Sequence, residues 1–264
     1  MLHFEEYRHA TSDLWVVFVH GMGGSTLTWK KQINAFQQEY NVLLIDLPGH
    51  GKSQEVAGRV THKHVNEDIK NVLDALGIRK ADFIGMSLGT LVIMSFAVAY
   101  PDYVHSVILG GAVINAQGIY RHLMGIADVI KEFLPKVATY KLVAQIVMPS
   151  KWHKKSRGIF FREAQNLSRR SFRSWVDYVT NMSKQREIME RLTTLKIPTL
   201  FVSGDHDSCF IGGVKKLSDK LSSAKLIVLE KCGHVCTIEK WKDFNQYALD
   251  YLHGLHPVAQ PVLA

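Results

Sequence analysis

The segment Gly85-Met86-Ser87-Leu88-Gly89 joins two apolar runs of different length. The run 81–86 has the length of a buried strand, and the run 88–100 has the length of a helix. A serine on a sharp strand-to-helix turn needs very small residues two positions before and two positions after it, because the backbone there is strained. Gly85 and Gly89 meet that need. The segment therefore predicts a serine hydroxyl held above a sheet at the positive end of a helix, although an ordinary strand-to-helix turn has the same composition.

Apolar runs of strand length recur on both sides of this turn, and segments with helical spacing separate them. Strands that are apolar on both faces belong to a parallel sheet covered by helices on each side. The alternation predicts an α/β fold with a mostly parallel, doubly wound sheet. The expected strands cover residues 13–19, 41–46, 81–86, 104–109, 199–203 and 226–229.

Residues 115–195 break this alternation, because their pattern is helical and interrupted only by Pro135 and Pro149. The break predicts a helical cap, 115–195, inserted into a core made of residues 1–114 and 196–264. Residues 116–196 also carry 16 Lys and Arg against 6 Asp and Glu, while the whole chain has a net charge of +8. This local charge fits a solvated surface, an anionic substrate, an acidic partner or an anionic membrane surface.

Composition excludes several classes of protein. Hydrophobic residues make up 47% of the 264 residues and charged residues 21%, which is ordinary for a globular chain and unlike a disordered or fibrous one. The longest apolar stretches are about half the length that spans a bilayer, and the first ten residues lack the apolar core of a signal peptide. Three cysteines do not suggest a disulfide framework, so we expect a cytoplasmic protein. No nucleic-acid motif accompanies the basic residues, and no nucleic-acid partner is expected.

A second turn, His20-Gly21-Met22-Gly23, follows the expected strand 13–19. A backbone amide at the end of that strand can complete an oxyanion hole with the amide that follows the nucleophile. Here the two amides are those of Met22 and Leu88. The two turns together are more specific than either alone.

A serine nucleophile needs a base, and the base needs an acid that orients it. The loop Gly204-Asp205-His206-Asp207 follows the expected strand 199–203, and Gly233-His234 follows the strand 226–229. Loops after neighbouring parallel strands lie at one edge of the sheet, the edge that carries Ser87. Position along the chain leaves either aspartate open as the acid.

These motifs, with Asp46-Leu47-Pro48-Gly49-His50-Gly51-Lys52-Ser53, resemble the α/β-hydrolase superfamily in its capped form over nearly the whole chain. The resemblance implies Ser87 as nucleophile, His234 as base and Asp207 as acid, with Asp205 the weaker choice. The chain departs from the family in its short N-terminal segment, which implies a trimmed leading antiparallel hairpin.

The resemblance implies a serine hydrolase that forms an acyl-enzyme on a small or medium carboxylic ester, without metal or organic cofactor. Carbon–carbon bond hydrolysis, perhydrolysis and elimination occur on the same fold. So do poorly catalytic relatives that bind ligands or act in signalling. The sequence leaves open the natural substrate, the substrate-binding residues and the oligomeric state.

Other candidate sites receive simpler interpretations. Cys232-Gly233-His234-Val235-Cys236 resembles a soft metal site, but a metal-bound His234 could not act as a base, and we interpret the cysteines, with Cys209, as small packing residues. We expect His62 and His64 to be solvated and His153 to lie on the exposed cap surface. Arg169 and Arg173 share a helix face by their spacing, and a solvent-facing stripe is favoured there over an anion clamp.

Overall fold

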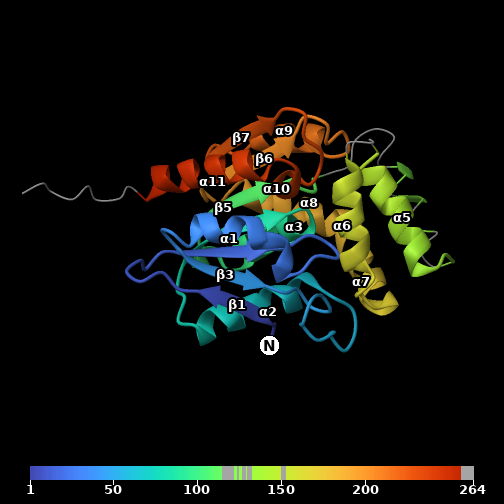
Figure 1. Cartoon of the computed structure of the whole chain (residues 1–264), viewed down its shortest axis with the longest axis horizontal. Helices are drawn as coiled ribbons and strands as arrows, with labels where there is room; N and C mark the ends of the chain where they lie inside the picture. The colour runs from blue at the N-terminus through green and yellow to red at the C-terminus, as the bar shows by residue number, and fades with distance from the viewer. Residues whose placement is uncertain (115–121, 124, 127–128, 130–132, 150–152, 257–264) are drawn as a thin grey trace, which may run out of the picture.

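The computed structural model describes residues 1–114, 122–123, 125–126, 129, 133–149 and 153–256 (Figure 1). Within these residues a seven-stranded sheet has the order β1-β3-β2-β4-β5-β6-β7. β1 pairs antiparallel with β3, and all other neighbouring strands are parallel, which confirms the predicted α/β fold. The strands are β1 (Phe4–Tyr7), β2 (Trp15–Val19), β3 (Asn41–Ile45), β4 (Ala81–Met86), β5 (Val104–Gly110), β6 (Thr199–Gly204) and β7 (Ala224–Leu229).

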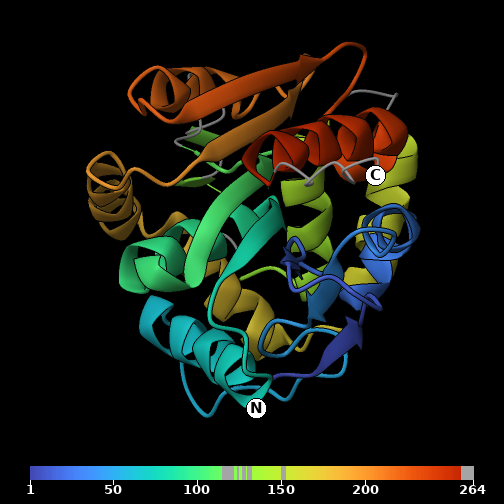
Figure 2. The ribbon, with the colours of Figure 1, turned by 90° about the vertical axis from the view of Figure 1, so that its left-hand side faces the viewer.

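Side chains that alternate along the central strands enter two separate hydrophobic clusters. In β2, Val17 and Val19 belong to one cluster, and Val16 and Phe18 belong to the other. The first cluster includes residues of α2 (His62–Ala75), α3 (Leu88–Ala99) and α9 (Ile211–Ser218), and the second includes residues of α1 (Lys30–Phe36) and α11 (Trp241–Leu255). The sheet is therefore covered on both faces, as Figure 2 shows from the side. This double cover explains why its strands are continuous apolar runs.

The described residues between β5 and β6 form α5 (Lys136–Val147), α6 (Lys154–Ala164), α7 (Arg169–Thr180) and α8 (Met182–Leu192). Figure 1 places α5, α6 and α7 together beyond one end of the sheet, whereas α8 lies next to α3. Ile188 and Met189 of α8 join the core cluster on the α3 face. Residues 115–121, 124, 127–128, 130–132 and 150–152 of the expected cap range lie outside the described residues. None of the helices in the described part of the chain is long and apolar enough to span a bilayer.

The strand β1 was not expected from the sequence; it has four residues and contains two glutamates. It pairs with β3 at the sheet edge, and it stands where the family resemblance implied a trimmed hairpin. A short, charged edge strand has no apolar alternation that could reveal it in a sequence. The remaining short elements are η1 (Thr26–Trp29), η2 (Pro101–Tyr103) and α10 (Cys236–Glu239).

Candidate active site

Ser87 occupies a strained turn between β4 and α3. Its backbone has φ 52° and ψ −116°, and its amide donates a hydrogen bond to the Gly110 carbonyl at 3.0 Å. A side chain at position 89 would place its Cβ 2.1 Å from the Val19 carbonyl oxygen. A side chain at position 85 would place its Cβ 2.9 Å from the Gly89 backbone carbon. The glycines on either side of Ser87 are thus required by close backbone contact, for the reason that the sequence suggested.

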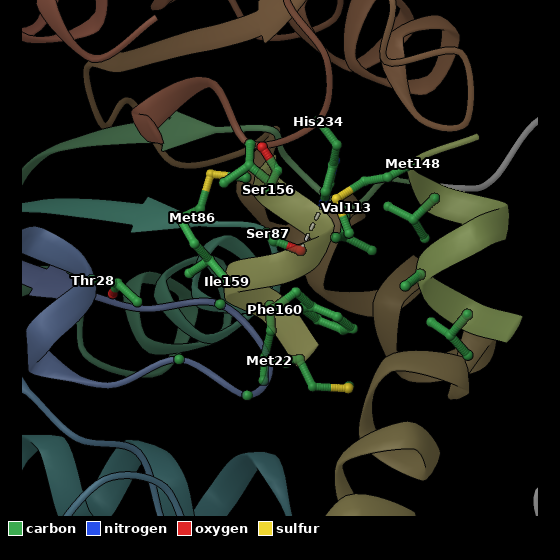
Figure 3. Close-up of a pocket in the computed structure, with 18 of the residues that line it drawn as sticks. Met22, Thr28, Met86, Ser87, Val113, Met148, Ser156, Ile159, Phe160 and His234 are labelled. Atoms are coloured by element: carbon green, nitrogen blue, oxygen red, sulfur yellow. Dashed lines mark hydrogen bonds between the residues drawn. The ribbon is translucent and has the colours of Figure 1, made fainter. Parts of the chain in front are cut away.

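The structure brings Ser87, His234 and Asp207 into one hydrogen-bonded chain. His234 Nε2 lies 2.8 Å from Ser87 Oγ, the contact that is dashed in Figure 3, and His234 Nδ1 lies 2.9 Å from Asp207 Oδ2. The side chains of His234 and Asp207 are 4% and 0% exposed. With Nδ1–H donating to the carboxylate, Nε2 is free to accept the serine proton. The arrangement can therefore convert the hydroxyl into a nucleophile.

Asp205 has a different set of contacts, although it belongs to the same loop. Its carboxylate accepts the backbone N–H groups of Lys231 and Cys232, each at 3.0 Å. Burial opposes its ionisation, but these amide hydrogen bonds outweigh that effect, and the pKa of Asp205 lies below its usual value. Asp205 thus braces the turn that precedes His234, and it is Asp207 that touches the imidazole.

Met22 and Leu88 line the same cavity as Ser87. Leu88 is the first residue of α3, so its amide has no acceptor within the helix. The loop that contains Met22 and Gly23 is bound to His50, because the Gly23 N–H donates a hydrogen bond of 3.0 Å to His50 Nε2. Burial, followed by the neighbouring His20, keeps the pKa of His50 well below its ordinary value. A neutral His50 keeps the lone pair that this contact requires.

Glu239 connects the His234 loop to helix α6. Its Oε2 accepts the Gly233 N–H at 2.7 Å, and its Oε1 accepts the Ser156 hydroxyl at 2.8 Å. Ser156 also lines the cavity beside Ser87. One carboxylate therefore fixes both the residue next to His234 and one wall of the cavity. No sequence signal marked Glu239, because its two partners are 83 and 6 residues away along the chain.

The cavity in front of Ser87 is almost entirely apolar (Figure 3). Helices α5, α6 and α7 supply one wall through aliphatic and aromatic side chains, and the sheet side supplies the other. None of the described residues that line it is Lys, Arg, Asp or Glu. The α5–α7 wall consists of Val143, Ala144, Val147, Ser156, Ile159, Phe160, Val176, Val179 and Thr180. The sequence did not identify these lining residues.

Two histidines differ from the expectation of solvent exposure. His153 is 1% exposed, and its ring packs so closely on the backbone of Gly233 that a Cβ there would lie 2.2 Å from Nε2. His62 is 8% exposed, and its ring stacks on Tyr178 with centroids 3.8 Å apart. In both cases tertiary packing covers a side chain whose sequence neighbours are polar. His64 is exposed, as expected.

The three cysteines are buried free thiols. Burial raises the pKa of Cys209 and that of Cys232 to about 12, and it also raises the pKa of Cys236 well above the ordinary value of a thiol. Neutral thiols are poor metal ligands and poor nucleophiles. Their burial agrees with the interpretation as packing residues.

Comparisons with known proteins agree with this geometry. The family model of the alpha/beta hydrolase fold matches residues 15–240. A 2-hydroxy-6-oxononadienedioate/2-hydroxy-6-oxononatrienedioate hydrolase of a Pseudomonas species is 29% identical over 91% of this chain and 88% of its own. A putative carbamate hydrolase of Acinetobacter baylyi is 24% identical over 97% of this chain and all of its own length. Among solved structures, an enol-lactonase from Burkholderia xenovorans superposes with a TM-score of 0.80 at 19% identity, covering 95% of this chain and 96% of that one.

Proposed function

This chain belongs to the α/β-hydrolase family and is a hydrolase, and we propose that it is a serine esterase that acts through an acyl-enzyme. The observation that carries the proposal is the continuous hydrogen-bonded chain from Ser87 Oγ through His234 to Asp207. Ser87 and His234 line a cavity whose other lining residues include side chains of α5, α6 and α7. An unbroken nucleophile–base–acid chain is the arrangement that acyl transfer requires.

In the proposed reaction, Ser87 Oγ attacks the ester carbonyl carbon while His234 Nε2 accepts the hydroxyl proton. The carbonyl oxygen becomes an oxyanion, which the Met22 and Leu88 amides stabilise. Collapse of the intermediate breaks the bond to the alkoxide, which takes the proton from His234, and leaves the acyl group on Ser87. Water, deprotonated by His234, then repeats the sequence and releases the acid. Asp207 stays ionised and holds the imidazole in the required tautomer.

We propose that the acyl group is uncharged and apolar. Placing a carboxylate against an apolar wall without a cationic partner costs several kcal/mol, and the described lining offers no Lys or Arg. The sequence left an anionic substrate open because the insertion is basic. The cavity supports the uncharged alternative, since its described lining contains, beside Ser87 and His234, only apolar groups, small hydroxyls and the neutral indole of Trp29.

A carbon–carbon bond hydrolase is the second candidate, because that activity occurs on this fold and the Pseudomonas relative is named as a hydrolase of a dienedioate. A dioate brings two carboxylates, and these need cationic or amide partners in the pocket. The apolar lining therefore favours the ester, or a lactone, which is a cyclic ester. Steady-state assays on an aryl ester and on a vinylogous ring-fission ketone distinguish the two activities.

We also propose that residues 115–195 act as the cap of this site. Helices α5, α6 and α7 form a wall of the cavity, while α8 packs against α3 of the core. The substrate-selecting part of the insertion is then α5 to α7, and α8 returns the chain to the sheet.

The decisive experiment combines covalent labelling with kinetics. A fluorophosphonate probe should add one adduct, detected by intact mass, and peptide mapping should place it on Ser87. The Ser87→Ala variant should lose the adduct and about four or more decades of kcat on p-nitrophenyl esters. A Ser87→Ala enzyme that retains near-normal hydrolysis would exclude the proposed mechanism.

A further inference from the structure

A second cluster of chemically competent side chains lies at the opposite end of β4 from Ser87. Asp82, near the start of β4, meets His105 of β5 and His256, the residue that follows α11. Ser87 lies five positions after Asp82, so at the rise of a β-strand the two lie about 16 Å apart. This cluster is therefore separate from the proposed esterase site.

The three side chains form a compact donor set. His105 Nδ1 lies 3.1 Å from Asp82 Oδ1, and His256 Nε2 lies 2.7 Å from Asp82 Oδ2. The two imidazole rings stack with centroids 4.3 Å apart, and one potential ligand atom from each of the three residues lies within 4.8 Å of the others. Two imidazoles and one carboxylate are a common ligand set for divalent zinc and its neighbours in the first transition series.

An irregularity in the sheet lies at this cluster. The register between β4 and β5 shifts at Asp82, since Ala81 pairs with Val104 but Asp82 pairs with Ser106. His105 is the extra residue, and such a bulge redirects side chains relative to a regular strand. As a result, both His105 and Ser106 reach the Asp82 carboxylate, and Ser106 Oγ donates a hydrogen bond to Oδ1 at 2.5 Å. A hydroxyl bound to the carboxylate is the kind of outer contact that orients a metal ligand.

We propose that Asp82, His105 and His256 bind one Zn²⁺ ion, which fastens the end of α11 to the start of β4 and β5. With ligand bonds of about 2.0–2.1 Å in a tetrahedral site, donor atoms lie about 3.3 Å apart, so none of the donor separations needs to change by more than about 1.5 Å. Asp82 is 2% exposed, whereas His105 is 33% exposed. That opening admits the ion and a water molecule as the fourth ligand.

Binding requires the two histidines to turn nitrogen lone pairs, rather than N–H groups, toward the ion. In the metal-free contact each histidine donates an N–H to Asp82, so in the zinc-bound form His105 Nδ1 and His256 Nε2 give up those protons. Acidification should weaken binding, because protonated imidazole has no free lone pair.

The test is a Zn²⁺ titration of chelator-treated protein that carries no histidine tag, followed by calorimetry. The wild-type protein should bind one Zn²⁺ per chain, and its Tm should rise with Zn²⁺ concentration, because the ion binds only the folded chain. His105→Gln and His256→Gln should each weaken binding at least tenfold and abolish the Tm response. His64→Gln, which changes an exposed histidine of α2, and His234→Gln should bind Zn²⁺ like the wild type.

Two results would overturn the assignment: a wild-type protein that takes up no Zn²⁺, or glutamine variants that bind it as well as the wild type. If the glutamine variants do not fold, the visible absorption spectrum of Co²⁺ added to the wild-type protein tests the ligand assignment. Visible bands of low-coordinate Co²⁺ without a thiolate charge-transfer band support the nitrogen and oxygen ligands. A strong thiolate band would assign the ion to cysteines, and the absence of visible bands would leave no such site; either outcome rejects the proposal.

Discussion

His234 Nδ1 lies 2.9 Å from Asp207 Oδ2, while Asp205, two residues earlier in the same loop, holds the amides of Lys231 and Cys232 instead. Two carboxylates in one loop thus contact the same neighbouring loop in different ways. Asp207 contacts the imidazole of His234, and Asp205 accepts hydrogen bonds from the backbone of the turn that precedes His234. This difference separates the effects expected from substituting each aspartate.

Asp207→Asn should lower kcat on an aryl ester by about 10⁴, because an amide that donates to Nδ1 stabilises the wrong imidazole tautomer. Asp205→Asn should keep kcat within about tenfold, since it retains one acceptor for the turn, and should instead lower Tm. Steady-state kinetics and thermal unfolding of both variants test this. A larger kcat loss in Asp205→Asn than in Asp207→Asn would reverse the assignment of the acid.

Glu239→Gln should lower kcat more than it changes KM. Glutamine can accept only one of the two hydrogen bonds that Glu239 accepts, so either Gly233 next to His234 or Ser156 in the cavity wall loses its partner. Ser156→Ala is the matched control, because it removes the α6 contact and leaves the Gly233 contact intact. We expect a decrease of about tenfold in kcat for Glu239→Gln and a change mainly in KM for Ser156→Ala. Equal effects on kcat would show that Glu239 acts only through the cavity wall.

The apolar cavity predicts a preference for longer, uncharged acyl chains. Each added CH₂ that is buried contributes about 0.8 kcal/mol, so kcat/KM on straight-chain p-nitrophenyl esters should rise about fourfold per carbon until the cavity is filled. Ile159→Ser should flatten this series. A chain-length profile of the wild type and the variant provides the measurement.

An ester with a terminal carboxylate should be a poorer substrate than its neutral counterpart of equal length. The described lining has no cation to pair with that charge. If the basic insertion instead captures anions from solution, the anionic ester would be preferred at low salt, and that preference would fall as salt shortens the Debye length from about 10 Å at 0.1 M to about 3 Å at 1 M. Charge reversal at Arg169 and Arg173 would then affect only the anionic ester.

His62 should make the fold less stable in mild acid. Burial, with the nearby Lys184, lowers the pKa of His62 to about 4, while an unfolded histidine titrates near 6.5. The unfolded chain therefore binds more protons between these values, so the stability is complete above pH 6.5 and declines as the pH falls toward 4. The loss from this residue is about 2 kcal/mol at pH 5.

Urea denaturation at pH 8 and pH 5 measures this loss. His62→Gln removes the titrating group while keeping a polar side chain opposite Ser95, and the unfolding free energy should depend less on pH in this variant. His64→Gln, two residues further along α2 and exposed, should keep the wild-type dependence. The prediction fails if both variants show the same pH dependence as the wild type.

The sequence by itself determined most of the sheet, because strands buried on both faces carry apolar runs. Such runs marked six of the seven strands, including β7, which lies at the sheet edge and is only partly buried. The sequence also determined the Ser87 turn, since close backbone contacts leave room only for glycine at positions 85 and 89. Both features depend on neighbours along the chain, and local neighbours can be read from one sequence. The edge strand β1 was not predicted, because its pairing depends on β3 rather than on a pattern in its own residues.

Only the tertiary structure decided how the loops meet. Position along the chain leaves both Asp205 and Asp207 open, and only the family resemblance favoured Asp207. Their separate contacts arise from the path of the β6 loop past the β7 loop. Three further features depend on contacts between different packed elements: the burial of His153, the two hydrogen bonds of Glu239, and the contact of Asp82 with His256. The hydrogen-bonded residues are between 6 and 174 positions apart along the chain. Such contacts follow from the packing of helices and loops against the sheet, and no local periodicity records that packing.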